Sequence, residues 1–152
     1  MNPQNRRGFT LIELITVVVV IGVLSSIGTM RYLSLENDAL TSKVGSEMQE
    51  IRLAALNYYT EHETWPAPAS EGVIPLELAP LLSGATQFTT PHYTLEWRNV
   101  NGDDPAGIVG VVVRGTRAGL SQKLVQRLVY GSPYVGMGSD VMYIIKAPGI
   151  AM

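Results

Sequence analysis

Residues 6–28 read RRGFTLIELITVVVVIGVLSSIG, an apolar run that follows two arginines and keeps one carboxylate, Glu13. From Phe9 to Met30, about 22 residues carry no other charge, and a helix of that length measures roughly 33 Å at ~1.5 Å per residue. This is enough to span the hydrocarbon core of a bilayer. Because a backbone in lipid must satisfy its own polar groups, we expect a helix here even through the β-branched run at 17–20.

Residues before and within this run predict the orientation of the helix in a membrane and its packing. Arg6 and Arg7 precede it and residues 1–7 contain no acid, so the short amino-terminal tail should remain cytoplasmic and the bulk of the chain should lie across the membrane. Gly22 and Ser26 form a small-xxx-small pair, a spacing that allows close helix packing.

The run has two ordinary interpretations, a secretory signal peptide and a plain single-pass anchor. A secretory signal peptide would have its basic region at residues 1–7, its apolar core near 14–24 and a small-x-small cleavage site at 26–28. A plain single-pass anchor would tolerate Glu13 as a charge near the interface. A carboxylate deep in lipid costs several kcal/mol, so Glu13 calls for a partner that neither interpretation supplies.

The heptapeptide Arg7-Gly8-Phe9-Thr10-Leu11-Ile12-Glu13 resembles the processing site of type IV prepilins and of the pseudopilins of type II secretion. The resemblance implies cleavage after Gly8, N-methylation of Phe9, and use of Glu13 in recruitment to a growing filament. Cleavage would create an amine cation on Phe9. Glu13 could pair with that amine on the same or a neighbouring subunit, and a buried charge is tolerable chiefly when it is paired.

The resemblance also implies partners and a location. The partners would be a prepilin peptidase/methyltransferase, other pilin or pseudopilin subunits, an inner-membrane assembly platform and the lipid bilayer. The chain would be a single-pass protein of the cytoplasmic membrane with its head on the periplasmic or extracellular side, and later part of a pilus or pseudopilus. Met30 stands where many major pilins have a helix-breaking proline. The choice between a major subunit and a minor pilin or pseudopilin therefore stays open.

Beyond the apolar run, the sequence predicts that the helix continues as an amphipathic one to about Glu63, on the order of 80 Å in all. An apolar stripe recurs at spacings of three, four or seven: Leu33, Leu40, Val44, Met48, Ile51, Ala55 and Tyr58. Polar residues are expected mostly on the remaining faces: Glu36, Asn37, Ser42, Lys43, Glu47, Gln49, Glu50 and Arg52. Gly45 is a local weakness, and the prolines that begin at Pro66 end the helix.

The remainder predicts a small α+β head. Residues 66–91 form a connecting loop with a short helical turn at 76–82. The strands 93–98 and 108–113 form a hairpin around the turn 101–105, a helix covers 117–130 and is closed by Gly131, and a last strand covers 141–146. The glycine-rich residues 131–140 are predicted to be a flexible crossing. We thus expect three or four antiparallel strands packed on the long helix with one extra short helix.

These patterns divide the chain into four parts: a cleaved basic leader at 1–8, a transmembrane half of the long helix at 9–30, an amphipathic half at 31–63 and a globular head at 64–152. With 152 residues, the chain has room for one compact domain besides a membrane segment.

Signals for catalysis, metals and nucleic acid are weak. The absence of cysteine excludes thiolate chemistry, and His62 and His92 lack ligand spacing on one helix. Asp103 and Asp104, together with Asn101 and Asp140, are a weak calcium candidate without the calcium-loop pattern. A net charge of −2 with scattered basic residues gives no nucleic-acid footprint. We expect no enzyme activity and no cofactor.

Two functions remain open at this stage. The first is a structural subunit of a type IV pilus-like or type II secretion pseudopilus filament, as the resemblance implies. The second is a membrane-anchored or exported binding protein that contacts an unknown ligand through residues 66–91 or 131–140. Replacing Glu13 by Gln distinguishes them, because only the first requires the charge.

Overall fold

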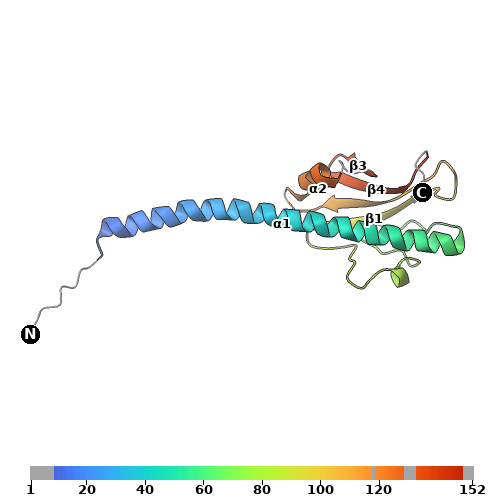
Figure 1. Ribbon diagram of the computed structural model, residues 1–152, viewed down its shortest axis with the longest axis horizontal. Helices are drawn as coiled ribbons and strands as arrows, with labels where there is room; N and C mark the ends of the chain where they lie inside the picture. Colours follow the sequence, from blue (N-terminus) through green and yellow to red (C-terminus); the bar gives the residue numbers. More distant parts are fainter. Residues whose placement is uncertain (1–8, 118, 129–132, 149–152) are drawn as a thin grey trace, which may run out of the picture. The chain divides into compact units, whose positions relative to one another are not determined.

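The computed structural model describes residues 9–117, 119–128 and 133–148. The described elements are α1 (Leu11–His62), η1 (Ala79–Leu81), β1 (Tyr93–Val100), β2 (Ile108–Gly115), α2 (Leu120–Leu128), β3 (Tyr134–Met137) and β4 (Asp140–Lys146), drawn in Figure 1. The chain divides into two compact units, Met1–Glu36 and Asn37–Met152. The long helix predicted from Phe9 to about Glu63 is confirmed as α1, a single helix of 52 residues. It ends at His62, because the next residue, Glu63, has a left-handed φ of 57° that breaks the helical repeat.

The first unit presents apolar side chains on every face of the helix. Most of its large apolar residues between Leu11 and Met30 are at least half exposed, and α1 is long and apolar enough in this part to cross a membrane. Its hydroxyl groups bond back to the helix: Thr16 donates to the carbonyl of Ile12 at 2.8 Å, and Ser26 to that of Val23 at 2.7 Å. Polar side chains satisfied in this way are compatible with lipid.

The second unit is an antiparallel sheet with strand order β1-β2-β4-β3. Leu95 of β1 pairs with Val113 of β2, and Val111 of β2 pairs with Tyr143 of β4. One face of the sheet and the stripe of α1 form a single buried cluster, which includes Val44, Met48, Ile51, Ala55, Leu95, Trp97, Val111, Val113 and Tyr143. The predicted α+β fold, a long helix packed on a small sheet with an extra short helix, is confirmed.

The alternation that predicted β1 is visible in its burial. Tyr93, Leu95 and Trp97 are fully buried, and the residues between them are partly exposed on the other face. The edge of β1 is covered by the connecting segment, residues 64–91. The amide of Leu95 donates to the carbonyl of Phe88 at 2.8 Å, and the amide of Gly72 donates to the carbonyl of Leu95 at 2.8 Å. The segment is thus bound along β1.

Three local expectations need correction. Residues 131–140 were expected to form a flexible crossing, but they include β3, whose Tyr134 pairs with Tyr143 of β4. Glu47 and Asn37 were expected on polar faces, but both are buried. Leu33 belongs to the predicted stripe but is exposed in the first unit. The proposed closure of α2 by Gly131 lies outside the described residues.

Candidate assembly site

The carboxylate of Glu13 is held by the residue that precedes α1. Its Oε2 atom accepts hydrogen bonds from the backbone amide of Thr10 at 2.9 Å and from the Thr10 hydroxyl at 2.7 Å, and the amide of Glu13 donates to that hydroxyl at 3.4 Å. This reciprocal pattern is a capping box. The Thr-x-x-Glu spacing is its signal in the sequence, independent of the resemblance to a processing site.

Glu13 has no cation on its own stretch of helix. Between Phe9 and Met30 it is the only charged side chain, and Arg31 lies eighteen residues beyond it, roughly 27 Å along the helix axis. Phe9 is 84% exposed, and Gly8 lies outside the described residues. A cation for Glu13 must therefore come from an amine at residue 9, from the tail at 1–8 or from another molecule.

Gly22 and Ser26 lie one helical turn apart on α1, as their spacing predicts. No atom stands within 4 Å of the position that a Cβ at Gly22 would take, so the helix surface there is open. Within the described chain, neither residue packs against another element, and their predicted role in helix packing stays a prediction.

A buried carboxylate in the second unit is used for internal bracing. Oε2 of Glu47, 5% exposed, accepts a hydrogen bond of 2.6 Å from the Tyr93 hydroxyl. Nζ of Lys43 is 3.5 Å from its Oε1 atom. Burial, together with the adjacent Glu47, raises the pKa of Tyr93 above its ordinary value. The phenol therefore stays protonated as a donor.

The acidic turn proposed as a weak calcium candidate is already bound to other groups of the chain. Asp103 Oδ1 accepts the Trp65 amide at 3.0 Å. The ammonium of Lys146 donates to the carbonyl oxygens of Gly102 and Asp104, where a metal ion would have found ligands. Asp140 pairs with Arg114 at 3.1 Å. Across residues 9–117, 119–128 and 133–148, no cluster of three or more His, Asp or Glu residues could hold a metal ion.

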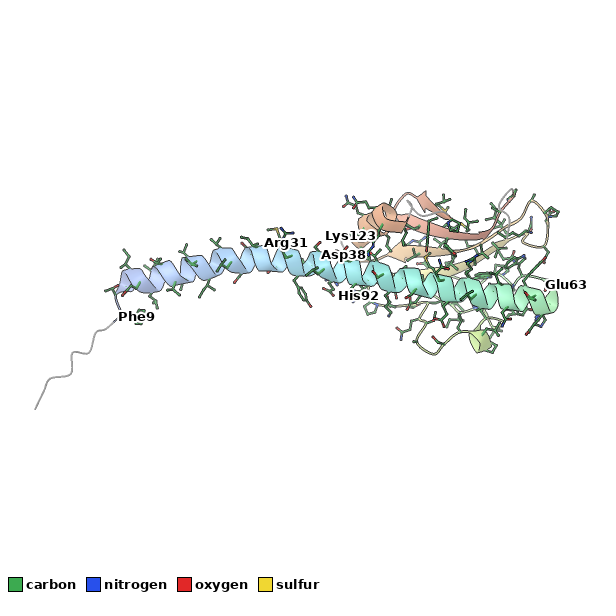
Figure 2. The ribbon with its side chains drawn as sticks, viewed as in Figure 1. Phe9, Arg31, Asp38, Glu63, His92 and Lys123 are labelled. Atoms are coloured by element: carbon green, nitrogen blue, oxygen red, sulfur yellow. The ribbon has the colours of Figure 1, made fainter. Side chains whose placement is uncertain are left out.

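The two histidines lie on different elements. His62 ends α1, where its ring stacks on Tyr58 with centroids 4.2 Å apart. His92 precedes β1, and its backbone carbonyl accepts the Thr116 amide at 2.9 Å. Figure 2 labels His92 away from Glu63, the residue that follows His62.

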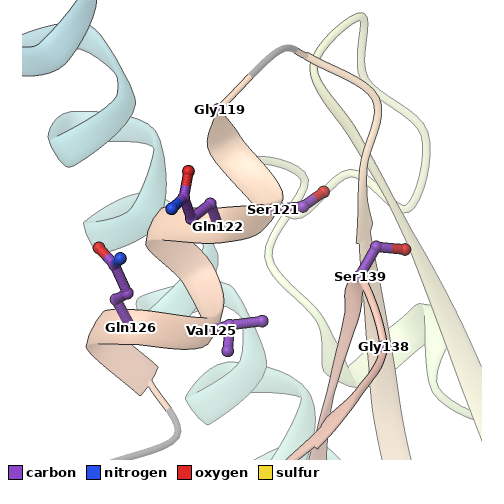
Figure 3. A pocket seen from close by; sticks show the side chains of 7 residues that line it. All are labelled: Gly119, Ser121, Gln122, Val125, Gln126, Gly138 and Ser139. Carbon is purple, nitrogen blue, oxygen red and sulfur yellow. The ribbon is translucent and has the colours of Figure 1, made fainter.

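A hollow of about 610 Å³ lies between α2 and the turn that joins β3 to β4 (Figure 3). Gln122, Val125 and Gln126 of α2 line one side, and Gly138 and Ser139 of the turn line the other. α2 is fixed to α1 by Lys123, whose Nζ is 2.8 Å from Oδ1 of Asp38; both are labelled in Figure 2. The residues that line the hollow include no charged side chain.

Comparison with known proteins points to the amino-terminal segment. The family model described as "Prokaryotic N-terminal methylation motif" matches residues 3–29. The "Type IV major pilin protein PilA" of Myxococcus xanthus (strain DK1622) is 31% identical over 70 residues, which are 46% of this chain and 31% of that protein. The "Probable minor fimbrial protein" of Dichelobacter nodosus is 49% identical over 51 residues, 34% of this chain and 32% of that protein.

The matches cover only part of each relative, since the chain spans about a third of the length of both. No solved structure gives a significant match. The matched motif overlaps the part of α1 that is long and apolar enough to cross a membrane. The motif, the two relatives and the long helix packed on an antiparallel sheet together support a type IV pilin-like family for this chain.

Proposed function

We propose that this chain is a structural subunit of a type IV pilus-like filament. A prepilin peptidase would cut it after Gly8 and methylate the new amino terminus at Phe9. The processed chain would then leave the cytoplasmic membrane by packing its apolar helix against the helices of other subunits. The role is mechanical rather than catalytic, and the second unit would face the periplasm or the exterior.

One observation carries the proposal: Glu13 is the only charged residue between Phe9 and Met30, an exposed apolar stretch that lies almost wholly within the matched methylation motif. Thr10 donates two hydrogen bonds to Oε2 of Glu13 but supplies no positive charge. An amine cation on Phe9 of a neighbouring subunit would supply one. Pairing of these groups would make their burial tolerable and would fix the axial register of two helices.

A pilus is favoured over a secretion pseudopilus because the relatives are named as a pilin and a fimbrial protein. The proposed partners are a prepilin peptidase/methyltransferase, other subunits of the same filament, and an assembly platform in the inner membrane. The proposed division of the chain is a leader at 1–8, a membrane half of the helix at 9–30, an amphipathic half at 31–63 and a head at 64–152.

The processing step is tested by the intact mass and the amino-terminal residue of the protein from cells that contain the prepilin peptidase. We expect an N-methylated Phe9 start. A chain that starts at Thr29 would indicate ordinary signal-peptidase export, and an uncut Met1 would indicate a plain anchor. Either result would overturn the processing step.

The assembly step is tested by Glu13→Gln, which keeps the size of the side chain and removes its charge. We expect normal membrane levels of the variant and loss of its incorporation into sheared filaments. Glu61→Gln, at an exposed site near the end of α1, is the matched control and should assemble normally. Normal incorporation of Glu13→Gln would contradict the proposed charge pairing.

A further inference from the structure

The second unit carries a large apolar side chain that projects into solvent from an ordered turn. Leu76 is 89% exposed, while Leu78, two residues later, is fully buried. The turn is closed by hydrogen bonds from the amides of Leu78 and Ala79 to the carbonyl of Pro75, both at 3.1 Å. Buried neighbours and closed hydrogen bonds hold Leu76 in place, so its exposure is a fixed feature of the surface.

The hollow beside α2 lies at the opposite edge of the sheet. Leu76 belongs to the connecting segment, which is bound along β1. The hollow includes Gly138 of the β3–β4 turn, and the strand order places β1 and β3 at the two ends of the sheet. In Figure 1, η1 of the connecting segment lies on one side of α1, and α2 and β3 lie on the other. One molecule therefore cannot fill its own hollow with its own Leu76.

The charged residues that lie next in sequence to Leu76 and to the residues of the hollow differ in sign. From Leu53 to Trp97 the sequence contains Glu but no Asp, Lys or Arg, and Glu77 directly follows Leu76. From Pro105 to Ser139 it contains Lys and Arg but no acid, and Lys123 and Arg127 of α2 stand next to the hollow-lining Gln122 and Gln126. Asp38 of α1 balances part of this positive charge, because both cations lie within 4.0 Å of it. α2 itself carries these two cations and no acidic residue.

The hollow suits an aliphatic side chain with an acidic neighbour. Val125 and the methylene stems of Gln122 and Gln126 offer apolar contact, and the amide groups of the two glutamines can accept and donate hydrogen bonds. Its volume of about 610 Å³ is larger than one leucine side chain.

On these grounds we propose that Leu76 of one subunit inserts into the hollow formed by Gln122, Val125, Gln126 and Gly138 of a second copy of this chain, with Glu77 facing the positive surface of α2. The contact joins two different surfaces, so it is heterologous, and repetition builds an open helical assembly rather than a closed dimer. The inference rests on the proposed filament and adds the contact that holds neighbouring second units together.

The absence of cysteine makes the contact testable without background. The full-length variant Leu76→Cys with Gln126→Cys is produced in cells that assemble filaments, and intact filaments are treated with a short bismaleimide. We expect a ladder of dimers, trimers and higher species, because each copy carries both halves of the contact. Each single-cysteine variant should remain monomeric. Leu76→Cys with Ser46→Cys, which places the second thiol on the exposed face of α1, is the matched control and should give no ladder.

The outcomes separate this contact from the filament itself. Filaments of the double variant that give no ladder would overturn the contact and leave the proposed function standing. Failure of the unmodified chain to form any filament would overturn both. A cross-link from Leu76→Cys to a different protein would overturn a second copy as the occupant.

Charge substitutions at Glu77 and Gln126 give a second, independent test of the contact. Glu77→Lys places a cation against the positive α2 surface, and Gln126→Glu places an acid against Glu77, so each alone should lower filament yield several-fold. The two together restore opposite charges and should recover most of the yield. Equal loss in the double variant would contradict the pairing, because a general folding defect is not repaired by a second change.

Discussion

The hydroxyl of Tyr93 donates a hydrogen bond of 2.6 Å to Glu47, which lies 46 residues earlier in the chain. The bond joins the first residue of β1 to the buried face of α1 and so fixes the helix against one edge of the sheet. It also gives a donor to one oxygen of a carboxylate that is only 5% exposed. A buried acceptor that loses its donor costs more than the bond itself contributes.

Tyr93→Phe should therefore destabilise the second unit by about 1–3 kcal/mol while leaving its packing volume nearly unchanged. Urea unfolding of the full-length protein in detergent, followed by tryptophan fluorescence, measures this, because both tryptophans, Trp65 and Trp97, lie in the second unit. Tyr32→Phe, at an exposed site in the first unit, is the control. Equal unfolding midpoints for the two variants would show that the hydrogen bond does not stabilise the fold.

Much of the fold could be predicted because its signals are local. The run from Phe9 and the stripe through Val44, Met48 and Ile51 predict one long helix, and the alternation around Leu95 and Trp97 predicts β1. These patterns depend on residues a few positions apart, and the structure confirms the helix and the strand.

The missed features depend on partners far away in sequence. β3 has four residues, of which three are exposed and one is glycine, and it is a strand because Tyr134 and Val135 pair with β4. Glu47 was expected to lie on a polar face because carboxylates are rarely buried. Its burial depends on Tyr93, and no local pattern in the sequence predicts that partner. Lys146 likewise finds the carbonyls of the β1–β2 turn only in the folded chain. The roles of Gly8, Phe9 and Glu13 stay predictions, since they concern processing and a second molecule.

The capping box at the start of α1 gives a second prediction. Thr10→Val keeps the shape of the side chain and removes the hydroxyl that bonds Glu13, so the first turn should lose about 0.5–2 kcal/mol. Amide hydrogen exchange of the full-length protein in micelles should show faster exchange at residues 11–14 only. Thr10→Ser keeps the hydroxyl and should exchange like the parent protein. Unchanged exchange in Thr10→Val would show that the cap does not hold the turn.

Acid should weaken the anchoring of the connecting segment on α1. The Thr86 hydroxyl and the Ser83 amide donate to Glu50 at 2.5 and 2.6 Å and hold the pKa of Glu50 below its ordinary value. Because the folded pKa lies below the unfolded one of about 4.3, this stabilisation is complete above that value and is lost as the pH falls through the folded pKa.

The expected result is a urea midpoint that declines as the pH falls below about 5. Glu50→Gln should have a lower midpoint at neutral pH and a flatter decline in acid, since it has no charge to lose. Glu61→Gln, an exposed residue of the same helix, should keep the parent slope. If the urea midpoint of Glu50→Gln declined with pH as steeply as that of the parent protein, the acid sensitivity would belong to other carboxylates. Glu71 is one of them, because the Thr94 hydroxyl and Arg114 lower its pKa.

Gly45 offers a stabilising change inside α1. Glycine in a helix interior costs roughly 0.5–1 kcal/mol relative to alanine because it loses more backbone entropy on folding. A Cβ at Gly45 would lie 3.7 Å from Cδ2 of Leu128, an ordinary contact with α2, so Gly45→Ala should raise the stability of the second unit by about that amount.

Gly107→Ala is the opposing case on the β1–β2 turn. A Cβ there would lie 1.7 Å from the carbonyl oxygen of Asn101, a backbone atom that cannot move aside without reopening the turn. We expect a clear loss of stability in the same urea assay. If Gly45→Ala were also destabilising, the new Cβ would contact Leu128 more tightly than the 3.7 Å distance indicates. The packing of α2 against α1 would then affect stability more than helix propensity does.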